Sequence, residues 1–155
     1  MLYRMHAIDM TIELLPRIMW LLMGAILFIA HFASNTLPVV ADNIIVLIAG
    51  VLLVLIGGAF SLWSFILLAG PMISKKLVVT GPYQYVRHPM YLSLYTVLLG
   101  IGVVFFSTLW FTIMLIFIPV WHLICLAEEW HLSRIHNTTY REYKRLSGMY
   151  FPKIL

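Results

Sequence analysis

The sequence predicts an all-α integral membrane protein with four transmembrane helices in a single domain, residues 1–155. Of its residues, 63% are hydrophobic and only 10% are charged, against about 25% charged in an ordinary soluble domain. The mean hydropathy is +0.99, and the charges are confined to short segments between long uncharged stretches. Because so apolar a chain cannot cover itself with polar side chains, lipid must be its solvent.

The first part of the chain predicts a surface helix followed by a span. Residues 1–17 mix charges of both signs with apolar residues, a pattern typical of an amphipathic helix on the membrane surface. The apolar run after them predicts a first transmembrane helix over residues 17–37. Acidic residues precede this run and no small-x-small cleavage pattern comes after it, so a cleaved signal peptide fits the sequence poorly.

The next uncharged stretch, residues 43–74, is longer than the roughly 20 residues that cross a bilayer. It predicts a span over residues 44–70, in which Gly57-Gly58 introduces a kink and Gly70-Pro71 ends the helix. Gly57 and Ser61 also form a small-xxx-small pair, which suits close packing between helices.

The last uncharged stretch, residues 89–127, is about twice as long as one span requires. Two helices over residues 89–106 and 108–127 therefore fit it, joined near Phe106-Ser107-Thr108 as a tight hairpin. Such a hairpin returns the chain to the membrane face from which it started.

The C-terminal part of the chain is polar and basic. Thr139 and Glu142 have the spacing of a capping box, and Gly148 has the place of a helix C-cap. These residues predict a short helix at the membrane interface, with tyrosines on one side and basic residues on the other.

The basic residues set the expected orientation. With four spans, all ten of them fall on one side, so the positive-inside rule places both termini and the polar segment 75–88 in the cytoplasm. We expect membrane lipids as partners and no nucleic acid. The ten residues are Arg4, Arg17, Lys75, Lys76, Arg87, Arg134, Arg141, Lys144, Arg145 and Lys153.

The segment before the third span holds the residues best suited to chemistry. Pro89 fits the first position of that helix, and Arg87 beside the N–H groups of its first turn makes an anion-binding helix start. His88, Tyr91 and Tyr95 occur at spacings that share one helix face. The segment is Gly81-Pro82-Tyr83-Gln84-Tyr85-Val86-Arg87-His88-Pro89-Met90-Tyr91.

Glu128, at the expected end of the fourth helix, is the second half of the candidate site. A carboxylate there gains nothing from the helix dipole, so a cationic or multi-hydroxyl partner would explain it. The hairpin would bring His88 and Glu128 to the same membrane face. A nucleotide-like zwitterion that enters from the cytoplasm meets these requirements.

The same residues also have purely structural explanations. Arg, His and Tyr side chains anchor membrane interfaces, and a glutamate pair can be a solvated helix end. His31 and His122 lie inside spans, where hydrogen bonds between helices are the favoured explanation. The other histidines show no metal-like pairing and Cys125 is the single cysteine, so we expect no metal.

Four elements succeed one another over residues 75–155: Gly81-Pro82-Tyr83, Arg87-His88-Pro89-x-Tyr91, Glu128-Glu129 and Tyr140-x-x-Tyr143. With the intervening hairpin, this arrangement resembles the isoprenylcysteine carboxyl methyltransferase and phospholipid methyltransferase family. Members of that family are integral membrane enzymes that use S-adenosyl-L-methionine.

The resemblance implies a cofactor site and assigns its residues. We take Arg87, His88 and Glu128 as the candidate catalytic residues, and Tyr95 and Ile124 as the candidates for contact with the acceptor. In the family, the polar segment and the start of the third helix hold S-adenosyl-L-methionine on one side, and the first glutamate holds it on the other. The implied cofactor-binding residues are Lys76, Leu77, Val78, Tyr83, His88, Pro89, Tyr91 and Glu128.

Two positions depart from the family pattern. Members that act on isoprenylcysteine carry an arginine four residues before the first glutamate, thought to hold the substrate carboxylate, whereas this chain has Ile124. Family members usually have glycine two residues after the motif tyrosine, whereas this chain has Ser93. This second departure alters local helix packing. The first departure leaves the acceptor open.

Methyl transfer from a sulfonium needs alignment and desolvation more than acid–base groups. Because the only strong base candidates, His88 and Glu128, are assigned to the cofactor, a thiol or carboxylate on an apolar or lipidic acceptor is favoured. The alternatives are a phospholipid or amine N-methyltransferase, an NADPH-binding reductase of the sterol type, and a four-helix transporter or assembly factor. A transporter would place its acid mid-bilayer, whereas the acidic residues here lie near span ends or outside.

Overall fold

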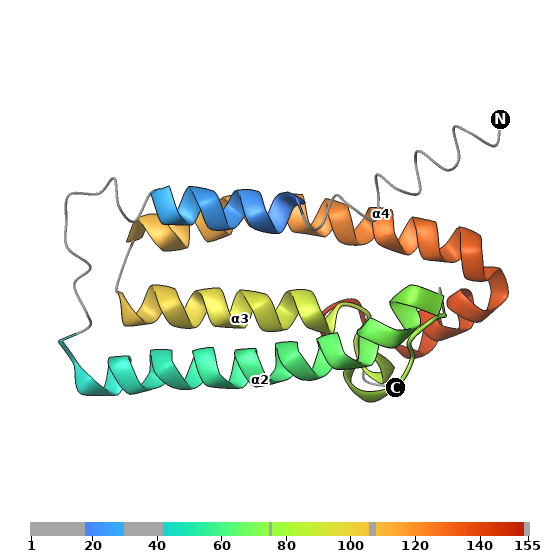
Figure 1. Cartoon of the computed structure of the whole chain (residues 1–155), viewed down its shortest axis with the longest axis horizontal. Helices are drawn as coiled ribbons and strands as arrows, with labels where there is room; N and C mark the ends of the chain where they lie inside the picture. Colours follow the sequence, from blue (N-terminus) through green and yellow to red (C-terminus); the bar gives the residue numbers. More distant parts are fainter. Residues whose placement is uncertain (1–17, 30–41, 75, 106–107, 154–155) are drawn as a thin grey trace. The chain divides into compact units, whose positions relative to one another are not determined.

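The computed structural model describes residues 18–29, 42–74, 76–105 and 108–153 (Figure 1). Within these ranges the regular structure is helical, with one isolated bridge and no strand, which confirms the all-α prediction for them. The described residues fall into two compact units. One contains residues 18–29 and 108–135, and the other contains residues 42–105 and 136–153.

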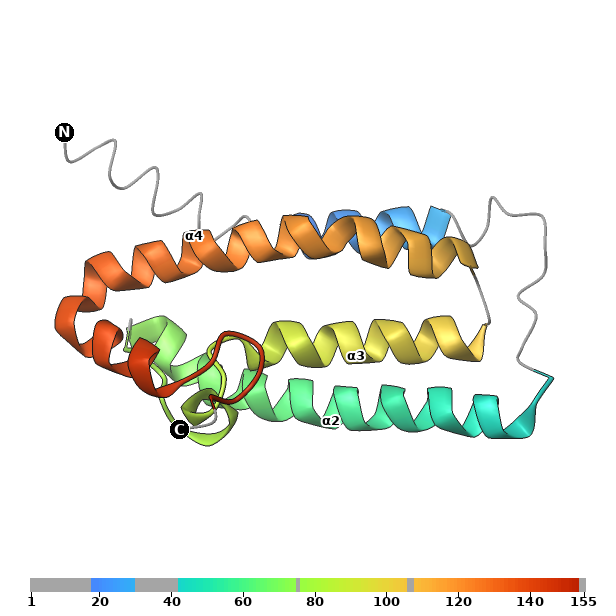
Figure 2. The ribbon, with the colours of Figure 1, turned by 180° about the vertical axis from the view of Figure 1, so that it is seen from behind.

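The first unit pairs an N-terminal helix, Ile18–Ile29, with the part of α4 up to residue 135. The two helices lie side by side in both ribbon views (Figures 1 and 2). The rings of Trp20 and Trp121 pack against each other across the contact, tilted by 31° with their centroids 4.0 Å apart. Met23, on the same side of the N-terminal helix, is 1% exposed, so this helix has a buried stripe.

Helix α4 spans Thr108–Leu146 and is longer than the sequence predicted. The expected helix end at residue 127 is wrong, because α4 continues through Glu128-Glu129. No Gly or Pro interrupts the chain between there and Asn137, where φ is 41° and the helix kinks. Asparagine tolerates a positive φ better than most residues do. Beyond the kink, the helix to Leu146 matches the predicted C-terminal helix.

The second unit is built on α2 (Ile44–Ser74) and α3 (Pro89–Val104). The two helices lie side by side in both ribbon views (Figures 1 and 2). Helix α2 does not end at Gly70-Pro71, as the sequence predicted, but continues to Ser74. It is also one continuous helix through Gly57-Gly58. Membrane helices tolerate an internal proline because neighbouring groups can satisfy the backbone positions that it frees.

Small residues allow α2 and α3 to approach closely. A Cβ on Gly57 would lie 2.9 Å from the Ser93 carbonyl oxygen, and a Cβ on Gly100 would lie 2.7 Å from the Gly50 carbonyl oxygen. Over residues 44–69 of α2, the buried positions are Gly50, Gly57 and Ser64, which recur every seven residues. The small-residue packing expected at Gly57 is therefore present. Its partner backbone is that of Ser93, the position where the family has glycine.

Two of the described helices, Ile44–Ala69 within α2 and Thr108–Leu146, are long and apolar enough to cross a membrane. Many of their large apolar side chains are exposed, including Ile45 at 73% and Leu123 at 65%, as expected for helices surrounded by lipid. The helices Ile18–Ile29 and Pro89–Val104 are apolar but shorter. Their crossing, and hence the count of four spans, stays a prediction.

Three predicted features lie outside the described residues. They are the amphipathic helix over residues 1–17, the end of the first span within residues 30–41, and the hairpin turn at residues 106–107.

Candidate functional site

The motif segment begins with a short 3₁₀ helix, η1, at Gly81–Gln84. Gly81 has a φ of 60°, in the left-handed region that favours glycine. A Cβ at this position would lie 2.5 Å from Cδ1 of Leu67 on α2. The glycine therefore lets the chain turn tightly against α2, and this turn places the motif at the end of the α2–α3 pair.

The join between η1 and α3 agrees with the sequence prediction. Pro89 begins α3, His88 is its N-cap residue, and no side chain caps the helix start. His88 and Tyr91 are each 5% exposed, and their ring centroids lie 5.7 Å apart. An imidazole and a phenol ring are thus buried together at a helix N-terminus, where the helix dipole favours an anion.

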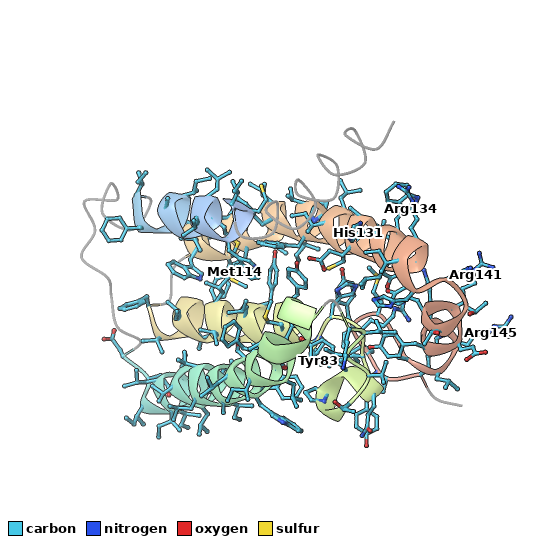
Figure 3. All side chains as sticks on the ribbon, turned by 45° about the vertical axis from the view of Figure 1, so that its right-hand side comes forward. Tyr83, Met114, His131, Arg134, Arg141 and Arg145 are labelled. Carbon is cyan, nitrogen blue, oxygen red and sulfur yellow. The ribbon has the colours of Figure 1, made fainter. Side chains whose placement is uncertain are left out.

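Tyr83 is held by the C-terminal helix. The hydroxyl of Tyr143 donates a 2.6 Å hydrogen bond to the Tyr83 carbonyl oxygen. Tyr83 is 7% exposed and Tyr143 is 9% exposed. Figure 3 places Tyr83 among the side chains gathered at this end of the unit, whereas Arg141 and Arg145 extend outward. The C-terminal helix therefore turns its tyrosines inward and its arginines outward, as the sequence predicted.

The segment after the C-terminal helix pairs with the motif through backbone hydrogen bonds. The Gly148 N–H donates to the Tyr85 carbonyl at 3.0 Å, and the Arg87 N–H donates to the Gly148 carbonyl at 2.8 Å. The His88 N–H donates to the Met149 carbonyl at 3.2 Å. Two segments far apart in sequence thus form a short parallel pairing, which lies beside the start of α3 (Figure 2).

The side chain of Arg87 is directed to the same segment. Its Nη1 donates to the carbonyl oxygen of Ser147, and more distantly, at 3.4 Å, to that of Lys144. These carbonyls belong to the last turn of the C-terminal helix and to the residue after it, where intrahelical donors are lacking. Lys153 donates to the Lys144 carbonyl as well, at 2.8 Å.

An aromatic residue of the C-terminal segment also lies close to the motif. The ring of Tyr150 is 6.1 Å from that of His88, between centroids. The turn that carries Tyr150 depends on Gly148, because a Cβ there would overlap the carbonyl oxygen of Phe151.

The remaining candidates in this unit precede or follow the motif in the sequence. Lys76, Leu77 and Val78 lie between α2 and η1 in a segment without regular secondary structure, with Lys76 exposed and the other two half-buried. Tyr95 is half-buried on α3, one turn beyond Tyr91.

The candidates in the first unit all lie on α4. Glu128 is half-buried within the helix, about two and a half turns before the kink at Asn137, so it is not at a helix end. Ile124 is 4% exposed. Two further ionisable residues of this helix are buried, Glu129 at 3% and His131 at 8%. The sequence analysis used Glu129 only as the second residue of the glutamate pair and gave His131 no role. In the part of the chain that the structure describes, no group of three His, Cys, Asp or Glu side chains could hold a metal ion.

Comparison with known proteins identifies the family of the chain. The profile of the family described as phospholipid methyltransferase matches residues 45–139, a stretch that includes η1, α3 and Glu128. The chain belongs to the phospholipid methyltransferase family. This membership confirms the resemblance carried by the Arg-His-Pro-x-Tyr motif and the glutamate pair, and it indicates a membrane methyltransferase.

A curated relative is the nickel-cobalt-cadmium resistance protein NccN of Alcaligenes xylosoxydans xylosoxydans. It is 27% identical over 93 residues, which make up 60% of this chain and 43% of the relative. The chain therefore spans less than half the length of that protein. No solved structure matches the chain.

The contacts of segment 147–150 with the motif are a feature of the structure that sequence patterns did not predict. Gly148 was interpreted only as a helix cap, and Tyr150 was given no role. The one available signal was the family pattern Tyr140-x-x-Tyr143. That pattern places a C-terminal helix near the motif, but it does not extend to residues 147–150.

Proposed function

We propose that this protein is an S-adenosyl-L-methionine-dependent methyltransferase that acts on an apolar or lipidic acceptor. One observation carries the proposal. In a member of a methyltransferase family, His88 and Tyr91 are buried at the start of α3 beside a helix N-terminus that no side chain caps. The charge distribution supports a cytoplasmic position for this start.

The residues at the start of α3 fit the chemical groups of the cofactor. The N–H groups of the first turn and the helix dipole favour the carboxylate of a methionine moiety, and Pro89 has no N–H to lose there. A tyrosine face near a sulfonium contributes about 0.5 to 2 kcal/mol through a cation–π interaction, which is the role proposed for Tyr83 and Tyr91.

The other cofactor contacts rest on the family resemblance alone. We assign Lys76, Leu77 and Val78 to the lining of the site, and Glu128 to the amine or ribose of the cofactor.

When bound, S-adenosyl-L-methionine supplies an activated methyl group for an in-line displacement. The protein's own task is to align the acceptor and to keep water away, which the burial of His88 and Tyr91 serves. Ile124, where relatives that act on isoprenylcysteine have arginine, lies in the buried part of α4 with Trp121 and Cys125. Because these side chains are apolar, we propose that the acceptor enters from the bilayer. No guanidinium is present at this position to hold a carboxylate of the acceptor.

The nucleophile of the acceptor is proposed to be sulfur or oxygen. A thiolate or a carboxylate needs no general base, whereas an amine must first lose a proton. The second candidate is N-methylation of a phospholipid amine, and the observation that supports it is the description of the family as phospholipid methyltransferases.

Binding tests the cofactor assignment. The full chain, purified in detergent, should bind S-adenosyl-L-methionine and S-adenosyl-L-homocysteine, and His88→Ala and Glu128→Ala should each abolish binding. His136→Ala and Asp42→Ala are controls at half-buried and exposed positions and should bind like wild type. Wild-type affinity in both site variants would refute the assignment.

The acceptor requires a separate experiment. Membranes that contain the protein are incubated with methyl-labelled S-adenosyl-L-methionine, and the labelled lipids and peptides are separated by mass spectrometry. A labelled thioether or ester would support the S- or O-acceptor, and label on phosphatidylethanolamine would establish the amine alternative instead.

A further inference from the structure

We infer that the C-terminal segment 147–150 forms part of the cofactor site, in which Tyr150 contacts the cofactor beside His88 and Arg87 positions the segment. This inference rests on the proposed function. It adds one contact residue, and it changes the role of Arg87 from a catalytic residue to a positioning residue.

The first step is the fixed attachment of the segment to the motif. Three backbone hydrogen bonds of 2.8 to 3.2 Å join residues 85–88 to residues 148–149, and Val86 pairs with Gly148 in a parallel bridge. The N–H of His88 is one of the donors. The segment therefore pairs with the N-cap residue of α3 itself, and a displacement of the segment would disturb the helix start.

The second step is the role of Arg87. Its guanidinium donates to the carbonyls of Ser147 and Lys144, so it caps the end of the C-terminal helix from another part of the chain. A hydrogen bond between a charged donor and a helix-terminal carbonyl is among the stronger kinds, and the helix dipole adds to it. The described contacts of this side chain thus hold the segment in place.

The third step is the position of Tyr150. Its ring lies 6.1 Å from His88, and His88 lies 5.7 Å from Tyr91, between ring centroids. His88 and Tyr91 are buried, whereas Tyr150 is only half-buried. Tyr150 is therefore the most exposed ring of the three. An aromatic face at that place suits the adenine ring or the sulfonium of the cofactor.

The test measures the affinity of the detergent-purified full chain for S-adenosyl-L-homocysteine by isothermal titration calorimetry. Tyr150→Ala should weaken binding about tenfold, which corresponds to about 1.4 kcal/mol, whereas Tyr150→Phe should stay within about twofold of wild type because the ring remains. Phe151→Ala is the matched control, since Phe151 is the adjacent aromatic residue and is 75% exposed, and it should bind like wild type.

A double-variant cycle tests the role of Arg87. If Arg87 acts by positioning Tyr150, the double variant Arg87→Ala, Tyr150→Ala should bind about as weakly as Tyr150→Ala alone. Arg87→Lys, which retains a donor for the Ser147 carbonyl, should recover part of the affinity. Multiplicative losses in the double variant would overturn the positioning role, because Arg87 would then contact the cofactor independently.

The outcomes separate this inference from the proposed function. Tight binding by wild type together with unchanged binding by Tyr150→Ala would overturn the inference and leave the proposed function intact. If wild type binds neither S-adenosyl-L-methionine nor S-adenosyl-L-homocysteine, the proposed function fails and the inference fails with it. Thermal unfolding of each variant identifies any loss of fold, and Tyr150→Phe keeps the test decisive if Tyr150→Ala unfolds.

Discussion

The hydroxyl of Tyr143 donates a buried 2.6 Å hydrogen bond to the carbonyl oxygen of Tyr83, a residue 60 positions earlier in the chain. This bond joins η1, at the start of the motif, to the C-terminal helix. Because a buried backbone carbonyl without a donor is costly, the two segments stabilise each other. The second tyrosine of the Tyr140-x-x-Tyr143 pattern thus has a structural role in supporting the motif.

Removal of this hydroxyl tests that role. Tyr143→Phe should lower the free energy of unfolding by about 1 to 3 kcal/mol, since the Tyr83 carbonyl loses its buried donor. Thermal unfolding in detergent measures the change. Tyr85→Phe is the matched control, because Tyr85 is 57% exposed, and equal shifts in the two variants would contradict the assigned role.

Two adjacent glycines on α2 should respond in opposite ways to alanine. A Cβ on Gly57 would meet the α3 backbone at 2.9 Å, whereas a Cβ on Gly58 would have nothing within 4 Å. Gly57→Ala should destabilise the protein by about 1 to 3 kcal/mol, because the helices must separate. Gly58→Ala should stabilise it by about 0.5 to 1 kcal/mol, because alanine is the better helix former. Melting temperatures of the two variants provide the comparison, and a loss at Gly58 would argue against the observed α2–α3 contact.

Gly148→Ala should detach the C-terminal segment from the motif. The added Cβ would overlap the Phe151 carbonyl oxygen, so the turn after residue 147 would have to rearrange. We expect faster proteolysis after the C-terminal helix and a loss of affinity for S-adenosyl-L-homocysteine of at least about tenfold, if this segment lines the site as inferred.

The control for this variant is Gly24→Ala on the N-terminal helix, where a Cβ would have nothing within 4 Å. It should leave proteolysis and binding unchanged. A Gly148→Ala protein with a protected C-terminus and wild-type affinity would show that the turn does not require glycine.

Ser64→Ala should leave the stability unchanged or raise it by about 1 kcal/mol. Ser64 is 0% exposed, and its hydroxyl has no hydrogen-bond partner among the described residues. A buried hydroxyl without a partner disfavours the folded state, and alanine removes it at nearly the same size. The matched control is Ser93→Ala, whose hydroxyl donates to the Met90 carbonyl at 2.8 Å, and it should show no such gain. A clear loss at Ser64 would indicate that the hydroxyl has a bound partner in the membrane.

Local patterns predicted several features of the site correctly. Pro89 begins α3 because proline fixes a helical φ and has no N–H to leave unsatisfied. The capping pattern likewise predicted the helix before Gly148, since helix ends depend on residues within a few positions of one another. The end of α4 was predicted wrongly. The pair Glu128-Glu129 marks a change in polarity, but it contains no residue that breaks a helix, so the helix continues past it.

The amino-acid sequence by itself determined the class of this protein, its helical regions and its family motif. These depend on composition, on uncharged stretches of membrane-spanning length, and on the spacing of residues close in sequence. Only the tertiary structure decided what the C-terminal segment contacts. The pairing of Arg87 with Ser147 and of His88 with Tyr150 depends on backbone hydrogen bonds and on the turn at Gly148. Such contacts between distant residues leave no periodic signal in a single sequence, because many different side chains can satisfy a backbone carbonyl or pack against a ring.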